Sequence, residues 1–263
     1  MDFGISGKTA LVLGASSGLG QAIAIGLARE GVNVAVGARR QDELAKTVAA
    51  IEATGGKALA LPWDLADRSI IPTRIQAIED ALGPIDILIN NSGGPPPTPA
   101  AGQDPAVWLS QFESMVLSLI AVTDAVLPGM RARKWGRIIT STSSGVPMPV
   151  PNLAMSNSLR AVLHGWSKTL SREVAKDGVT VNVIVPGRIF TDRIAFLDSK
   201  RAEREGKSVE AIVADSLSAI PMGRLGDPAE YAAVAAFLAS QQAAYVTGTV
   251  VRVDGGMIPS VSN

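Results

Sequence analysis

The chain has 263 residues, with 24 basic and 24 acidic side chains, one histidine and no cysteine. The balanced charge argues against a nucleic-acid partner, and the absence of cysteine excludes disulfides and thiolate chemistry. With a single histidine and no clustered carboxylates we expect no metal site, and with no apolar stretch near ~18 residues we expect a cytoplasmic protein without a membrane span or signal peptide.

Short apolar runs alternate with helical patterns along the chain, which is typical of repeated strand–helix–strand units. Strands are predicted at Thr9–Leu13, Val32–Val36, Lys57–Leu61, Ile85–Ile89, Arg137–Thr140, Val179–Val185 and Val250–Val253. Between them, helices are predicted at Gly18–Glu30, Gln41–Thr54, Ser69–Leu82, Pro105–Arg133, Asn152–Lys176 and Pro228–Ser240. Most strands are continuous apolar runs, as expected for a parallel sheet covered on both faces. We predict one α/β domain over residues 1–263, a doubly wound, seven-stranded parallel Rossmann sheet with helices on both faces.

Two segments depart from this alternation. Residues 93–99 read GGPPPTP, a stiff loop directly after a strand. Residues 189–222 form a long, charged segment between a strand and the last helix. A substrate lid and a packed connector are both consistent with a segment of that length.

A glycine-rich turn follows the first predicted strand and leads directly into a helix. It reads Gly14, Ala15, Ser16, Ser17, Gly18, Leu19, Gly20. Glycines permit the tight turn and let backbone N–H groups approach a pyrophosphate, while the helix N-terminus adds its positive dipole end. The motif alone is weak evidence, but its place after an N-terminal strand predicts a nucleotide site.

From this turn onwards the sequence resembles the short-chain dehydrogenase/reductase family over nearly its whole length, and within it the 3-oxoacyl-(acyl-carrier-protein) reductases. One departure is Leu13, which stands where the family commonly has threonine. Further family motifs follow in order: Asn90-Asn91-Ser92-Gly93, Pro186-Gly187 ahead of Thr191, Val246-Thr247-Gly248 and Val253-Asp254-Gly255-Gly256. The resemblance implies that Asp64 and Leu65 lie against the adenine of a dinucleotide. It also implies further cofactor contacts from Asn91, Ser92, Gly93, Pro186, Gly187, Ile189 and Thr191.

The choice of cofactor depends on the end of the second predicted strand. An acidic residue there would bind the ribose hydroxyls of NAD, but this chain has Ala38-Arg39-Arg40. The guanidinium groups of Arg39 and Arg40 suit a 2′-phosphate. They favour NADP(H) over NAD(H), and thereby reduction, although solvated arginines at a helix start would give the same pattern.

The family's usual catalytic residues are asparagine, serine, tyrosine and lysine, the last two as Tyr-x-x-x-Lys. Alignment on Gly136–Thr140 and on Gly165–Lys168 places the serine at Ser143 and the tyrosine and lysine at Ser156 and Arg160; the asparagine falls on Met115. A shift of one residue would put Met155 and Leu159 at the Tyr-x-x-x-Lys positions, and neither can do that chemistry. The resemblance therefore implies an atypical site in which only Ser143 matches.

The replacements change the chemistry that is available. A serine hydroxyl has a pKa far above the ~10 of tyrosine, so Ser156 can hydrogen-bond a substrate oxygen but is a poor proton donor. Arg160 stays charged, can reach the cofactor ribose and can stabilise a developing oxyanion. Together with Arg188 and Arg193 it would also suit a carboxylate or phosphate on a substrate. His164 on the same helix is either a packing residue or an acid/base.

These observations predict an atypical NADP(H)-dependent oxidoreductase that reduces a carbonyl or imine-like small molecule by hydride transfer. Ser143, Ser156 and Arg160 would polarise the reacting oxygen while water supplies the proton. Two alternatives remain open: a nucleotide-binding sensor or scaffold without redox activity, and an isomerase or lyase on the same scaffold. The resemblance further implies a homo-oligomer, a dimer or tetramer, built through the fourth and fifth predicted helices.

Overall fold

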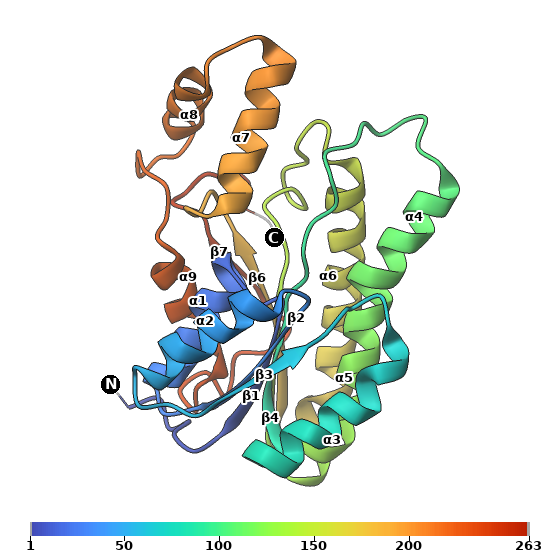
Figure 1. Ribbon diagram of the computed structural model, residues 1–263, viewed down its shortest axis with the longest axis vertical. Helices are drawn as coiled ribbons and strands as arrows, with labels where there is room; N and C mark the ends of the chain where they lie inside the picture. Colours follow the sequence, from blue (N-terminus) through green and yellow to red (C-terminus); the bar gives the residue numbers. More distant parts are fainter. Residues whose placement is uncertain (1, 262–263) are drawn as a thin grey trace.

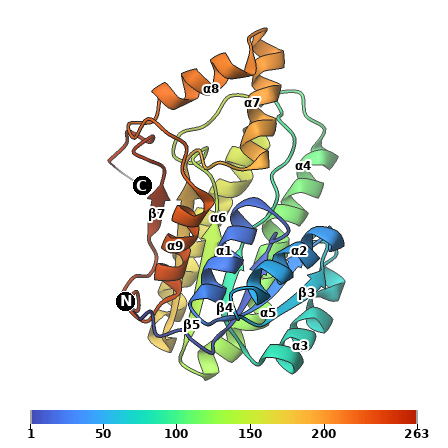
Figure 2. The same ribbon diagram turned by 60° about the vertical axis from the view of Figure 1, so that its left-hand side comes forward.

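The computed structural model describes residues 2–261, and these form one sheet of seven parallel strands with helices on both faces (Figures 1 and 2). The strands are β1 (Thr9–Leu13), β2 (Asn33–Ala38), β3 (Ala58–Pro62), β4 (Ile85–Asn90), β5 (Gly136–Ser141), β6 (Val179–Pro186) and β7 (Val250–Val253). Their order across the sheet is β3-β2-β1-β4-β5-β6-β7. The predicted α/β fold is confirmed.

Helices flank the sheet and cover its end. They are α1 (Gly18–Arg29), α2 (Gln41–Glu52), α3 (Ile71–Leu82), α4 (Pro105–Phe112), α5 (Ser118–Ala132), α6 (Ala154–Val174), α7 (Asp192–Glu205), α8 (Val209–Ser218) and α9 (Pro228–Ala239), with short turns η1 (Arg68–Ile70), η2 (Glu113–Leu117) and η3 (Ala175–Asp177). In Figure 1, α1, α2 and α9 lie on one side of the sheet and α3, α5 and α6 on the other.

The strands form because their side chains are apolar on both faces. Every residue of β1, β4 and β5 is buried, and two apolar clusters fill the space between the sheet and its two helical layers. Burying one Leu or Ile side chain stabilises a fold by about 1.5–3 kcal/mol, so these layers supply most of the driving force. Small residues bring α1 against α9: a Cβ on Gly26 would lie 3.1 Å from Ala232 Cβ.

The strand order reverses between β1 and β4, and the loops that leave their carboxyl ends diverge there. The side chain of Asn91, just after β4, joins the two loops. Its Nδ2 donates to the carbonyls of Leu13 (3.1 Å) and Gly14 (3.3 Å). This reversal is where an open α/β sheet binds ligands, and it positions the glycine-rich turn beside the Asn-Asn-Ser-Gly turn.

The predicted helix over 105–133 consists of α4, a π-helical turn (η2) and α5. This run, Pro105–Ala132, is the one helix in the described part of the chain that is long and apolar enough to cross a membrane by length and composition. One helix of this kind is weak evidence for a membrane span, and the run is interrupted by polar residues rather than continuously apolar. In its most apolar window 44% of the residues are buried, and a core helix of this length passes the same test.

The charged segment after β6 contains two helices, α7 and α8, separated by Gly206 in the left-handed region at φ +63°. Both helices stand above the carboxyl ends of the strands in Figures 1 and 2, away from the layers that flank the sheet. Their position is the one that a cover over the ligand crevice would take.

Candidate active site

A cavity of about 1000 Å³ opens at the carboxyl ends of the strands. Its walls come from the glycine-rich turn, the loops after β4 and β5, the start of α6, the segment after β6, and helices α7 and α8. Of the residues predicted from the sequence, it is lined by Gly14, Ser17, Gly18, Leu19, Gly20, Asn91, Ser92, Gly93, Ser143, Ser156, Arg160, Pro186, Gly187, Ile189 and Thr191. Residues from well-separated parts of the sequence are therefore brought to one space.

The glycine-rich turn forms one end of the cavity. Gly14 and Gly18 have φ of +61° and +57°, which favours glycine at both positions. A Cβ on Gly20 would overlap the carbonyl oxygen of Gly14 and lie 2.8 Å from Asn91 Nδ2. Ser17 precedes α1 without a side-chain capping bond, so the N–H groups of the first turn are left for an anionic ligand. This cradle fits a pyrophosphate.

Arg40 lies over the outer edge of this turn. Its Nη2 donates to Ser17 Oγ (2.7 Å) and Ser16 Oγ (3.2 Å), so the guanidinium sits beside the phosphate cradle. Arg39 is exposed and makes no hydrogen bond within residues 2–261. Ser16, Arg39, Arg40, Asp64 and Leu65 do not line the cavity itself, and Asp64 accepts a bond from the backbone N–H of Ala66 (3.0 Å). Of the two predicted arginines, only Arg40 contacts the glycine-rich turn through its side chain within residues 2–261.

Two of the hydroxyl groups that line the cavity belong to the predicted residues Ser143 and Ser156, and each has a proton to donate. Ser143 Oγ accepts a bond from the Gly145 N–H (3.0 Å), which leaves its own O–H free. Ser156, on the first turn of α6, is largely buried, and its hydroxyl has no hydrogen-bond partner among the residues the structure describes. Both hydroxyls can thus donate to a substrate oxygen.

Two of the neighbouring hydroxyls after β5 are engaged elsewhere, whereas the Ser144 side chain lines the cavity and makes no hydrogen bond among residues 2–261. Ser141 Oγ bonds the hydroxyl of Tyr231 on α9 (2.9 Å), and Thr142 Oγ1 bonds His164 Nε2 (2.9 Å). His164 lines a second cavity, of about 460 Å³, and burial lowers its pKa. Ser143 is therefore the better candidate than Ser141 or Thr142, and His164 reaches the main cavity only through Thr142.

Arg160 is buried and joins the ends of two strands. Its Nη1 donates to the Ser141 carbonyl (3.2 Å) and its Nη2 to the Ser92 carbonyl (3.0 Å). Burial lowers the pKa of Arg160 to about 10, so the guanidinium remains protonated at neutral pH. Met115, at the expected asparagine position, is buried in the core within η2 and does not line the cavity.

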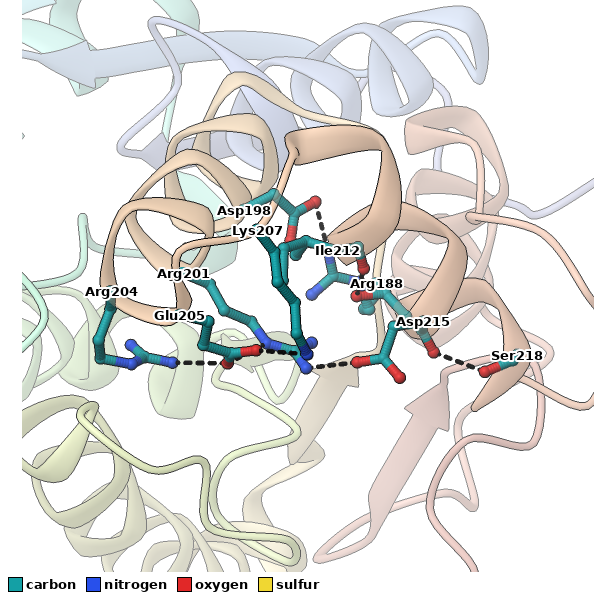
Figure 3. Close-up of polar contacts among 10 residues, drawn as sticks. Arg188, Asp198, Arg201, Arg204, Glu205, Lys207, Ile212, Asp215 and Ser218 are labelled. Atoms are coloured by element: carbon teal, nitrogen blue, oxygen red, sulfur yellow. Dashed lines mark hydrogen bonds and ion pairs between the residues drawn. The ribbon is translucent and has the colours of Figure 1, made fainter.

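Ion pairs hold α7 and α8 over the cavity (Figure 3). Arg188, next to Gly187, places its Nη2 2.5 and 2.6 Å from the two carboxylate oxygens of Asp198 on α7. Arg201 of α7 bonds Glu205 (2.8 Å) and also Asp215 of α8. The guanidinium that the sequence offered as a substrate ligand, that of Arg188, is thus occupied by a nearly buried carboxylate.

The sequence analysis missed Asp198, the partner of Arg188, and a tyrosine near the site. Tyr231 is fully buried, donates to the Ile184 carbonyl (3.3 Å) and contacts Ser141, and burial raises its pKa. It stands in an alanine-rich helix far along the chain, so no motif points to it.

Comparisons with known proteins agree with this geometry. A family model described as enoyl-(acyl carrier protein) reductase matches residues 14–258. The 3-oxoacyl-(acyl-carrier-protein) reductase of Vibrio cholerae is 36% identical over 253 residues, covering 96% of this chain and 98% of that protein. The structure of L-sorbose reductase from Gluconobacter frateurii with NADPH and L-sorbose superposes with a TM-score of 0.91 at 33% identity, covering 99% of this chain and all of that one. A variant of actinorhodin polyketide ketoreductase with NADPH gives 0.92 at 31% identity, covering 96% and 98%.

Proposed function

The chain belongs to the short-chain dehydrogenase/reductase family, and on that basis we propose that it is an atypical member that reduces a carbonyl or imine-like small molecule with NADP(H). It is an oxidoreductase of the short-chain dehydrogenase/reductase type. The main support for the atypical reductase is that Ser143, Ser156 and Arg160 line the same cavity as the glycine-rich turn that would hold the pyrophosphate. The named reductases offer no support for a non-redox scaffold or for an isomerase.

NADP(H) is the cofactor. Two of the similar structures contain NADPH, and the guanidinium of Arg40 bonds both serines of the turn that would hold the pyrophosphate. Bound there, NADPH supplies the hydride. Asn91, Ser92 and the segment Pro186–Thr191 line the cavity where we propose that they contact the nicotinamide half.

Substitution of Arg40 tests this assignment. Arg40→Ala should weaken NADPH binding roughly 10- to 100-fold, because a charged hydrogen bond to the 2′-phosphate is lost, and should leave NADH binding within about twofold. Calorimetric titration with each nucleotide measures both. Arg29→Ala, which removes a cation at the far end of α1, is the matched control. An equal loss for NADPH and NADH would contradict the assignment.

The chain's own residues would act on the substrate as hydrogen-bond donors and a fixed charge. Ser143 and Ser156 would donate to the oxygen or nitrogen that is reduced, and the Arg160 guanidinium would stabilise the negative charge that develops there. None of the three is a strong acid at neutral pH, so water would deliver the proton. A substrate that needs little acid catalysis, an activated carbonyl or an imine, suits such a site.

The experiment is a substrate panel followed by loss of NADPH absorbance. We expect turnover of activated ketones and cyclic imines and little turnover of simple aliphatic ketones. Efficient reduction of the simple ketones, with the pH dependence of an ordinary acid/base enzyme, would contradict the proposal.

We also propose that α7 and α8, within residues 189–222 of the single domain, act as a substrate lid.

We further propose that the protein is a cytoplasmic homo-oligomer. Apolar side chains remain exposed on helices of the sheet face that carries α4, α5 and α6: Val107 and Leu109 on α4 and Val162 on α6 are 45%, 59% and 43% exposed. A dimer or tetramer formed through the α4–α5 run and α6 would cover such a surface. Light scattering on the purified protein gives the oligomeric state.

A further inference from the structure

Some of the basic side chains that line the cavity are neutralised by a carboxylate and others are not. The six are Arg160, Arg188, Arg193, Lys200, Arg201 and Arg204. Four are paired, Arg188 with Asp198, Lys200 with Glu203, Arg201 with Glu205 and Asp215, and Arg204 with Glu205. Arg160 and Arg193 donate hydrogen bonds only to backbone carbonyls within residues 2–261. Two guanidinium charges therefore face the cavity without a counter-ion from the described part of the chain.

These two groups are anchored on the same short loop after β4. Arg160 Nη2 donates to the Ser92 carbonyl (3.0 Å) and Arg193 Nη2 to the Pro95 carbonyl (2.8 Å). The two anchor residues are three positions apart, a span of at most about 11 Å even in a fully extended chain. Arg193 also passes over Gly94, where a Cβ would lie 3.0 Å from its Nη2, so the glycine leaves room for the approach.

Both groups retain donors for a ligand. A guanidinium has five N–H donors in a planar fork, and protein carbonyls use two of those of Arg160 and one of those of Arg193. Burial lowers the pKa of both side chains, with that of Arg160 falling to about 10. Among the described carboxylates on the cavity wall, only the exposed Asp192 is not already in an ion pair. Two partly desolvated like charges without counter-ions are costly unless an anion joins them.

We propose that Arg160 and Arg193 together bind a carboxylate of the substrate, next to the group that is reduced. Because Arg160 follows Ser156 by one turn of α6, a carboxylate between the arginines lies beside an oxygen or nitrogen held by Ser156 and Ser143. The same cavity is walled by apolar side chains, Met148, Val150 and Leu197. The substrate class is thus a 2-oxo or 2-imino acid with an apolar side chain. This inference rests on the proposed reductase function and names its substrate.

The test compares benzoylformate, a 2-oxo acid with an apolar group, with its neutral methyl ester. Calorimetry on the NADP⁺-bound protein measures binding without turnover, and NADPH oxidation measures kcat/KM for each compound. Wild type should bind the acid at least about tenfold more tightly than the ester, because charged hydrogen bonds are the strong ones. Arg193→Gln should lower affinity for the acid roughly 10- to 100-fold and leave the ester within about twofold.

A charge-matched control separates the two arginines from the general potential of the cavity. Lys200→Gln removes a positive charge from the same helix, but one that already pairs with Glu203 (2.8 Å), so the acid-to-ester ratio should change less than about twofold. Equal affinity of wild type for acid and ester, or an equal loss of both in Arg193→Gln, overturns the proposal.

Repeating the titrations of acid and ester without nucleotide tests the carboxylate site separately from the proposed reductase function. Arg160 and Arg193 belong to the protein, so the preference for the acid should persist without nucleotide. Failure of NADP⁺ or NADPH to bind would sink the reductase function, whereas failure of the acid to outcompete the ester would sink the carboxylate site alone.

Discussion

Arg160→Met should lower kcat/KM for NADPH-dependent reduction by about 100- to 1,000-fold, the usual effect of removing a preorganised charge from a site where negative charge develops. Methionine fills a similar volume, but it cannot donate to the carbonyls of Ser141 and Ser92, which Arg160 holds at 3.2 and 3.0 Å. Steady-state kinetics at neutral pH, where the Arg160 pKa of about 10 keeps it charged, measures the loss.

Arg160→Lys distinguishes charge from geometry. A lysine keeps the positive charge and loses the planar fork, so we expect a smaller loss, on the order of tenfold. Circular dichroism and thermal unfolding show whether each variant keeps the fold. Wild-type kinetics in a folded Arg160→Met protein would show that Arg160 braces the strand ends and takes no part in the reaction.

Gly20→Ala should abolish measurable NADPH binding and lower the free energy of unfolding by about 2–4 kcal/mol. The new Cβ would overlap the Gly14 carbonyl oxygen and press on Asn91 Nδ2, so the turn or the start of α1 would have to move. Both neighbours are fixed, since Asn91 bonds the Leu13 and Gly14 carbonyls. Nucleotide titration and urea unfolding give the two quantities.

Gly165→Ala is the control, and it should change the free energy of unfolding in the opposite direction. Gly165 lies inside α6, and a Cβ there would have no non-helical atom within 4 Å. The substitution should raise the free energy of unfolding by about 0.5–1 kcal/mol, since alanine favours the helix, and leave NADPH binding unchanged. If Gly20→Ala bound NADPH as wild type does, the cradle would not be the pyrophosphate site.

The fold could be predicted from the sequence because its signals are local and repeat. Each strand is an apolar run whose two faces are covered, so β1 and β7 have the predicted bounds and the others differ by at most two residues. The glycine-rich turn could also be predicted from the sequence, because its backbone conformation favours glycine: Gly14 and Gly18 both have positive φ. The lining of one cavity by so many predicted residues follows from parallel strands that end at the same edge.

What the sequence could not supply is the direction of side chains. Register alone could not choose among four adjacent hydroxyls after β5, and only the structure shows Ser141 on Tyr231 and Thr142 on His164. Nor could it tell a paired arginine from a free one. The partner of Arg188 lies ten residues away on α7, so its neutralisation depends on how that helix folds back.

The pairing of Arg188 with Asp198 links the segment that follows β6 to α7. Arg188 directly follows Gly187, which lines the nucleotide end of the cavity, while Asp198 belongs to the helix that covers it. A nucleotide that settles the Pro186–Gly187 backbone therefore also fixes where the α7 cover is anchored. We therefore expect both segments to become more ordered together when the nucleotide binds, which amide hydrogen exchange of α7 with and without NADP⁺ measures.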